Sequence, residues 1–285
     1  METRKPSQTM IRTALWRAVH KLRDQDPKIL DDPFAGLLAG FDTDQAILEA
    51  HDASDVARIP GIRTPFVVRN RYAEDELTKA VTNGISQYVI LGAGLDSFAY
   101  RRPDLVQSLL VYEVDHPASQ AWKQQRLTQL ALATPPGLNH VPVDFETQTL
   151  SSELKRAGFR PNAPAFFSWL GTTQYLTREA VLSTIGEIAA LTEPGSEVVV
   201  QFIAPPSTIP EGDAAIANLL AERSAQGGEP WLSYFTPTDM EEIFRQVGCK
   251  GLEHFGAAEA TARYLQGRTD GSRVAAYFGM VKAVI

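Results

Sequence analysis

The sequence predicts an α/β fold in which helices cover both faces of a mostly parallel β-sheet. Five short apolar runs alternate with segments of helical periodicity after residue 85, which is typical of parallel strands joined by helices. The first of these runs leads directly into a glycine-rich turn. Two final apolar runs flank Asp270 and Gly271, a pair that favours a turn between neighbouring strands. We therefore expect the sheet to end antiparallel.

Two amphipathic helices are predicted before the first strand. Apolar residues recur at helical spacing in the stretch 9–30, and Asp31-Asp32-Pro33 then breaks the pattern. A second helical pattern runs from Val67 to Val81, and Asn83-Gly84 follows as a stop signal. We expect residues 1–84 to form an N-terminal helical cap together with a second helix that contributes to the ligand site.

The core is predicted to occupy residues 85–203. Its strands are continuous apolar runs, as expected for strands that are buried on both faces. The predicted strands cover residues 87–91, 110–114, 140–143, 165–170 and 197–203, and the clearest helical patterns between them cover 118–133 and 178–191.

The regular alternation stops after the fifth strand. Three prolines occur in 204–210, a helical pattern follows over 213–223, and Gln226-Gly227-Gly228 comes next. An insertion of this length is often a functional lid, although it could also be a peripheral helix. We treat 204–236 as a cap insertion and 237–285 as the final helix, 237–247, with the closing strands, 252–255 and 274–281.

Composition excludes several classes of protein. The 285 residues are 44% hydrophobic and carry a formal net charge of −7, which argues against a surface that binds nucleic acid. The single cysteine excludes an intramolecular disulfide, and the five histidines show no spacing typical of a metal site. No membrane-spanning or targeting segment is predicted. We expect a cytoplasmic protein that binds no metal, and we make no prediction about its oligomeric state.

Acidic residues at successive strand ends suggest a nucleotide-like ligand. Gly92 permits a tight turn after the first strand, and Gly94 lets a ligand approach the backbone. Glu113 and Asp115 end the second strand about twenty residues later, where a carboxylate can accept hydrogen bonds from both ribose hydroxyls. Either could do so while the other caps the following helix. Asp144 follows the third strand, where it could meet an adenine amino group or simply cap the strand end.

At this point the chain resembles bacterial S-adenosyl-L-methionine-dependent methyltransferases related to leucine carboxyl methyltransferases, some of which modify polyketides. The resemblance covers about residues 12–281. It rests on five motifs, which are Asp32-Pro33-Phe34-Ala35, Val68-Arg69-Asn70-Arg71-Tyr72, Leu91-Gly92-Ala93-Gly94-Leu95-Asp96, Tyr112-Glu113-Val114-Asp115-His116-Pro117 and the stretch from Trp169 to Thr177.

The resemblance implies a Rossmann-like class I methyltransferase fold with seven strands, one of them antiparallel, and S-adenosyl-L-methionine as cofactor. It implies that Gly92 and Gly94 border the methionine moiety, that Asp115 or Glu113 holds the ribose, and that Asp144 with Phe145 contacts the adenine. Arg69 becomes the expected partner of the cofactor carboxylate, with Arg71 as a second candidate. Leu170 stands where leucine carboxyl methyltransferases commonly have an acid that contacts the cofactor, so that contact is absent or supplied elsewhere. This departure favours a small-molecule acceptor over a protein.

The acceptor is expected to be a small molecule, such as a polyketide or aromatic compound, methylated on a carboxylate or hydroxyl oxygen. Trp231, Tyr234 and Phe235 could present flat apolar surface to it, or could be ordinary core residues. A hydroxyl acceptor would need a base, for which Tyr175 and His116 are the nearest candidates. We prefer Tyr175 as an orienting hydrogen-bond donor.

Two other classes fit part of the pattern. A nicotinamide-dependent oxidoreductase also has a glycine turn and an acid twenty residues later, but no tyrosine here is followed by lysine four residues on. A non-catalytic protein that binds S-adenosyl-L-methionine could retain the fold without the chemistry.

Overall fold

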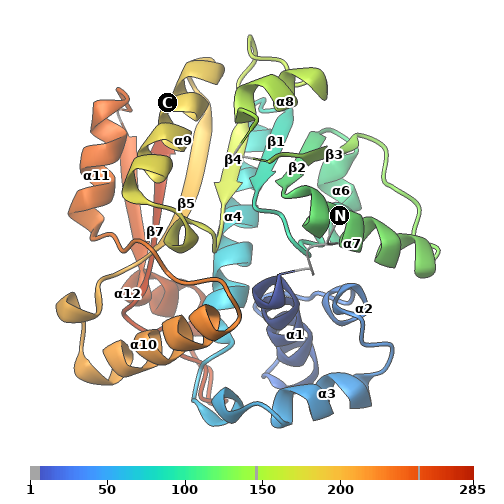
Figure 1. Ribbon diagram of the computed structural model, residues 1–285, viewed down its shortest axis with the longest axis vertical. Helices are drawn as coiled ribbons and strands as arrows, with labels where there is room; N and C mark the ends of the chain where they lie inside the picture. Colours follow the sequence, from blue (N-terminus) through green and yellow to red (C-terminus); the bar gives the residue numbers. More distant parts are fainter. Residues whose placement is uncertain (1–6, 145–146, 250) are drawn as a thin grey trace.

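The computed structural model describes residues 7–144, 147–249 and 251–285, and its centre is one seven-stranded sheet (Figure 1). The strand order is β3-β2-β1-β4-β5-β7-β6. Strands β1 to β5 are parallel, whereas β7 pairs antiparallel with both β5 and β6. The predicted fold is therefore confirmed. The strands are β1 (Gln87–Leu91), β2 (Leu110–Asp115), β3 (Leu138–Pro142), β4 (Phe166–Trp169), β5 (Glu197–Ile203), β6 (Gly251–Gly256) and β7 (Phe278–Val284).

The connection between the last two strands differs from the prediction. Instead of a tight turn at Asp270 and Gly271, the chain forms α12 (Ala257–Ala260) and the π-helical turn η4 (Thr261–Leu265) before β7 begins at Phe278. Asp270 accepts hydrogen bonds from the backbone N–H of Gln25, 2.8 Å away, and from the Arg268 side chain. Asp270 therefore ties this connection to the N-terminal region, and residues 274–277 are not strand.

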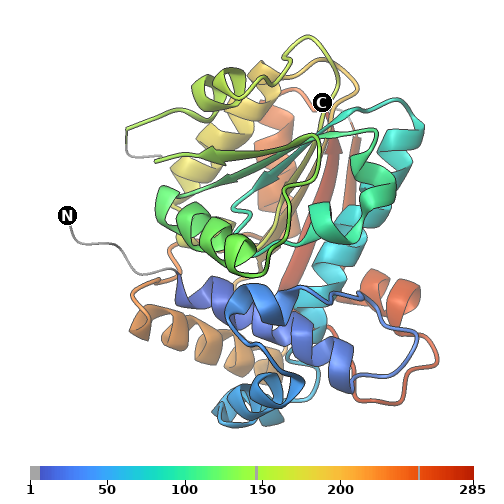
Figure 2. The ribbon, with the colours of Figure 1, turned by 90° about the vertical axis from the view of Figure 1, so that its right-hand side faces the viewer.

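Strand residues alternate between two hydrophobic clusters, one on each face of the sheet. Tyr88 and Ile90 belong to one cluster, whereas Val89 and Leu91 belong to the other. Helix α4 (Thr64–Thr82) covers the first face, and three other helices cover the second (Figures 1 and 2). Those three are α8 (Leu150–Arg156), α9 (Arg178–Leu191) and α11 (Pro237–Gln246).

A third group of helices lies across the carboxyl ends of the parallel strands, below the sheet in Figure 1. It contains α1 (Gln8–Arg23) and α10 (Glu211–Gln226), which come from the predicted cap segments. The backbone N–H of Thr9 donates to the Glu229 carboxylate at 3.2 Å, which joins the start of α1 to the chain that follows α10. The two caps meet although they are far apart in sequence.

Several short elements were not predicted from the sequence. Asp32 caps α2 by accepting hydrogen bonds from the backbone N–H groups of Phe34 and Ala35, and it forms a buried ion pair with Arg17 of α1 at 2.9 Å. The Asp-Pro-Phe-Ala motif thus anchors α1. The other unpredicted elements are α2 (Ala35–Ala39), α3 (Asp44–Asp52), α5 (Phe98–Arg101), α6 (Pro103–Val106), and the 3-10 turns η1 (Asp55–Arg58), η2 (Thr173–Tyr175) and η3 (Pro206–Thr208). Helix α7 (Pro117–Gln129) corresponds to the helical pattern predicted over 118–133.

Among the described helices, none combines the length and apolar character that crossing a membrane would require.

Candidate functional site

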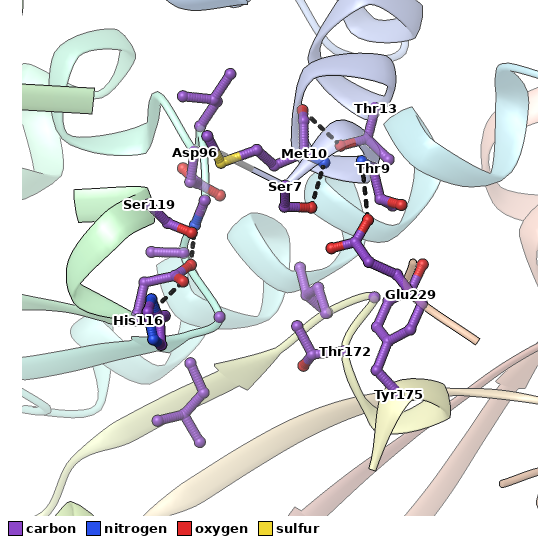
Figure 3. Close-up of a pocket in the computed structure, with 18 of the residues that line it drawn as sticks. Ser7, Thr9, Met10, Thr13, Asp96, His116, Ser119, Thr172, Tyr175 and Glu229 are labelled. Carbon is purple, nitrogen blue, oxygen red and sulfur yellow. Dashed lines mark hydrogen bonds between the residues drawn. The ribbon is translucent and has the colours of Figure 1, made fainter. Parts of the chain in front are cut away.

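A cavity of about 600 Å³ lies where the carboxyl ends of β1, β2 and β4 meet the cap helices (Figure 3). Its walls come from the glycine turn after β1, the start of α7, the loop after β4, the first turns of α1, and Gly227 to Glu229. In Figure 3, His116 and Ser119 lie on one side, while Thr172, Tyr175 and Glu229 lie on the other. We call this space the large cavity.

The glycine turn requires its glycines. Gly92 and Gly94 have φ of +65° and +48°, in the left-handed region that favours glycine. A Cβ on Gly92 would lie 2.3 Å from the Thr172 side chain, so the turns after β1 and β4 pack together only because Gly92 has none. Both glycines line the large cavity, as the sequence predicted for a ligand that approaches the backbone.

The structure separates the two acidic residues at the end of β2. Asp115 lines the large cavity and accepts hydrogen bonds from the backbone N–H groups of Gly94, at 2.5 Å, and His116, at 2.7 Å. Glu113 is fully buried behind it, where its carboxylate pairs with Lys123 of α7 at 2.5 Å. Asp115 is therefore the carboxylate placed to meet a ligand, whereas Glu113 holds α7 against the sheet.

Burial controls the charge of Asp115. Removal from water raises the pKa of its carboxyl above the usual range, and hydrogen bonds from Gly94 and His116 partly oppose this increase. A ligand that donates hydrogen bonds to the carboxylate would stabilise the ionised form further.

Arg69 is a buried cation without a carboxylate partner among the described residues. It lies on α4, lines the large cavity, and donates to Oε1 of Gln201 at 3.1 Å. Burial lowers the pKa of Arg69 to about 10, and the nearby positive charge of Arg17 adds to this effect. Since a buried charge is stable only when it is paired, the site is suited to a ligand carboxylate.

Gly171, after β4, makes room for this arginine. A Cβ at Gly171 would lie 2.3 Å from Nη1 of Arg69, and the residue has φ of +75°. Arg71, the second candidate, instead forms an ion pair with Asp75 at 2.8 Å and is not part of the large-cavity wall. The structure thus places Arg69, and not Arg71, beside the ligand space.

Of the two predicted adenine contacts, the structure describes only Asp144. Asp144 follows β3, and its backbone N–H donates to the side chain of Gln148 at 2.9 Å. Asp144 is not among the described residues that line the large cavity. Phe145 lies outside the described residues.

His116 and Tyr175 both line the large cavity, but their surroundings differ. Nδ1 of His116 accepts a hydrogen bond from the backbone N–H of Ala118 at 3.1 Å, which caps α7. The proton of the neutral ring is then on Nε2, so the imidazole has no second lone pair for a base. The hydroxyl of Tyr175 accepts a hydrogen bond from Ser224 of α10 at 3.4 Å.

A second, small cavity of about 30 Å³ adjoins the large one, because Thr9, Thr13, Arg69, Gly171 and Tyr175 line both. We call it the small cavity. Its other wall residues are Arg12, Trp16, Pro65, Phe66, Gln174, Gln201, Ile203, Leu220, Trp231 and Tyr277.

The three residues that were predicted to contact the methyl acceptor lie in different environments. Trp231 lines the small cavity, and its ring is 6.1 Å from the ring of Tyr234. Tyr234 is half-buried and lines neither cavity. Phe235 is fully buried in the hydrophobic core, with the guanidinium of Arg178 4.8 Å from its ring. Only Trp231 is placed to contact a ligand.

Sequence reasoning missed several residues that shape the site. Lys123 is buried in α7 and donates to the backbone carbonyl of Asp96 and to the Glu113 carboxylate, both at 2.5 Å. It therefore fixes the end of the glycine turn to α7. A lysine in the middle of an amphipathic helix gives no local sign of burial. Gly171 and Arg12 were also missed, although Gly171 directly follows a predicted strand and is therefore a recognisable turn residue. Within 7–144, 147–249 and 251–285, no group of His, Cys, Asp and Glu side chains is arranged to hold a metal ion.

Comparison with known proteins identifies a methyltransferase family. The family model described as leucine carboxyl methyltransferase matches residues 10–189. YktD of Bacillus subtilis (strain 168), which carries the name of an S-adenosyl-L-methionine-dependent methyltransferase, is 37% identical over 216 residues, or 75% of this chain and 70% of YktD. Rv1729c of Mycobacterium tuberculosis (strain H37Rv), with the same kind of name, is 30% identical over 78% of this chain and 70% of its own length.

Solved structures show the same fold. A crystal structure from Thermobifida fusca YX, titled as a methyltransferase, superposes with a TM-score of 0.61 and 20% identity, covering 98% of this chain and 94% of that one. A DUF574 family protein from Streptomyces avermitilis MA-4680 superposes with a TM-score of 0.59 and 17% identity, covering 88% and 95% of the two chains.

Proposed function

This chain belongs to the leucine carboxyl methyltransferase family and is a methyltransferase that depends on S-adenosyl-L-methionine; from that premise we propose that it methylates a carboxylate oxygen of a small organic acid. The large cavity is the proposed cofactor site, and the small cavity is the proposed site of the reacting group.

The residues of the large cavity fit the cofactor. The buried guanidinium of Arg69 lacks a carboxylate partner among the described residues, and the amino-acid end of the cofactor carries a carboxylate that could pair with it. Asp115 stands at the carboxyl end of β2, where a carboxylate accepts hydrogen bonds from ribose hydroxyls. Gly92 and Gly94 leave the backbone after β1 open to close approach. Asp144 and Phe145 remain the proposed adenine contacts on sequence grounds alone.

The protein's task in the reaction is alignment. When bound, S-adenosyl-L-methionine supplies a methyl group on a positively charged sulfur, which is already reactive towards an oxygen nucleophile. Arg69 and Asp115 would hold the two ends of the cofactor, and Tyr175 would donate a hydrogen bond that orients the acceptor at the junction of the two cavities. Positioning of two reactants can lower a barrier by about 7–11 kcal/mol, so alignment alone is a large effect.

The small cavity has no acidic or histidine side chain among its described wall residues, which supports a carboxylate acceptor. His116, the histidine nearest to the strand ends, uses Nδ1 to cap α7. A carboxylate is ionised at neutral pH and needs no base, whereas a hydroxyl usually needs one. This observation carries the proposal.

The product of the reaction tests it. The protein is incubated with cofactor labelled in the methyl group and with matched aromatic or aliphatic acids and phenols, and each labelled product is treated with mild alkali. We expect an ester, which releases labelled methanol. A labelled product that survives alkali would be an ether and would overturn the assignment to carboxylates. If the protein neither binds the cofactor nor turns over any acceptor, the proposed function is wrong.

A further inference from the structure

The small cavity is positively charged. Arg12 of α1 and Arg69 of α4 both line it, and no acidic residue is among its described wall residues. Arg12 forms no ion pair with a described carboxylate; Glu229 attracts it only from beyond ion-pair distance. Arg223 is also nearby, but its charge is paired with Asp55. The cavity thus holds one more guanidinium than the cofactor carboxylate requires.

Hydrogen-bond donors at this cavity also lack partners. Nε of Arg12 and Nε1 of Trp231 are both buried, and neither has a hydrogen-bond partner among the described residues. Buried donors without partners are costly, so a ligand that accepts hydrogen bonds is favoured there. The charge and the donors both point to an anion.

The size and the walls restrict the kind of anion. About 30 Å³ holds a group the size of a carboxylate and little more. Trp16, Phe66 and Leu220 supply apolar surface around it. The carbon atoms next to the carboxylate would therefore contact these side chains.

We propose that Arg12 binds the carboxylate of the methyl acceptor and selects acids with an apolar body over neutral molecules of the same shape. This rests on the proposed function, because it assumes that Arg69 is occupied by the cofactor carboxylate. The guanidinium of Arg12 also lies 5.6 Å from the ring of Trp16, so its position is supported from one side. In this proposal Arg12 determines specificity, and no covalent bond forms or breaks at it.

The test uses the full chain saturated with S-adenosylhomocysteine, whose binding is first measured by calorimetry. Trifluoroacetate is then titrated and observed by ¹⁹F NMR, with trifluoroacetamide as its neutral counterpart. We expect saturable broadening of the trifluoroacetate signal and at least about tenfold weaker binding of the amide, the effect of one charge-assisted hydrogen bond. Arg12→Met should weaken trifluoroacetate binding about tenfold or more, while Arg12→Lys should lose less because it keeps the charge.

Arg245→Met is the matched control. Arg245 is exposed on α11 and pairs with Glu242, so this variant changes the net charge equally but should bind trifluoroacetate as the wild type does. S-adenosylhomocysteine should bind Arg12→Met within about twofold of wild type.

Three results would overturn the proposal. Equal binding of the acid and the amide, or unchanged trifluoroacetate binding by Arg12→Met, would show that Arg12 does not recognise the anion. Weaker S-adenosylhomocysteine binding by Arg12→Met, tenfold or more, would assign Arg12 to the cofactor. By contrast, failure of the wild type to bind S-adenosylhomocysteine would contradict the proposed function itself.

Discussion

Replacing Gly171 by alanine should damage cofactor binding more than it damages folding. The new Cβ would lie 2.3 Å from Nη1 of Arg69, so the guanidinium must move away from Gln201. Loss of a charge-assisted contact costs about 1.5–3 kcal/mol, which corresponds to a dissociation constant larger by about 10- to 150-fold. The left-handed backbone, with φ of +75°, adds about 1–2 kcal/mol of destabilisation.

Gly158→Ala separates these two effects. Gly158 has φ of +91°, and its added Cβ would meet nothing within 4 Å. Urea unfolding should show a loss of stability in both variants, larger for Gly171→Ala because only its Cβ meets a buried side chain. Calorimetry with S-adenosylhomocysteine should show weaker binding only for Gly171→Ala.

A double-mutant cycle provides the sharper comparison. In an Arg69→Met background the clash at Gly171 is largely relieved, so Gly171→Ala should cost little further affinity. If Gly171→Ala binds S-adenosylhomocysteine as tightly as wild type, or if the two substitutions are additive, the assignment of Arg69 to the cofactor carboxylate is wrong.

Three further substitutions test other parts of the site. Asp115→Asn should weaken S-adenosylhomocysteine binding about 10- to 100-fold. Because burial raises the pKa of Asp115, the affinity of the wild type should fall as the pH is lowered through that pKa, while the affinity of the variant stays constant. A wild-type pH profile as flat as that of the variant would contradict this. Lys123→Met should destabilise the fold by about 3–5 kcal/mol in urea unfolding, since it removes the 2.5 Å ion-pair partner of the buried Glu113 and leaves only His140, at 3.4 Å, beside that carboxylate. Adding Glu113→Gln should recover part of that loss, and no recovery would argue against the ion pair as the cause. Tyr175→Phe should lower kcat/KM about 2- to 12-fold without changing S-adenosylhomocysteine affinity, and a rate near that of wild type would remove Tyr175 from the mechanism.

Strands that are buried on both faces were predicted well. The runs 87–91 and 197–203 match β1 and β5 residue for residue, because a strand packed on both faces is mostly apolar. The polar exceptions are Gln87 and Glu197 at the first positions and Gln201 inside β5. Short helices were not predicted. Helix α2 spans only Ala35–Ala39, and its cap, Asp32, is set by an ion pair with a different helix. A five-residue segment has too few turns to show a helical period.

The choice between paired candidates depended on tertiary contacts. Glu113 and Asp115 are equally placed by their spacing, and only the buried ammonium of Lys123 separates their roles. Arg69 and Arg71 are two residues apart on a helix, hence about 200° apart around its axis, but the sequence did not show which side faced the ligand. No local pattern distinguishes Trp231, which lines the small cavity, from its buried neighbours. The small cavity forms only because α1, which is distant in sequence, supplies other parts of its wall.

The position of β7 has a consequence for synthesis of the chain. β7 follows all other strands in sequence, yet it lies inside the sheet between β5 and β6. During synthesis, β5 is therefore made well before β7, and its edge presents unpaired backbone N–H and C=O groups until β7 pairs with it. The sheet is completed only when Phe278–Val284 is made, so the unfinished chain is the species most in need of protection from aggregation.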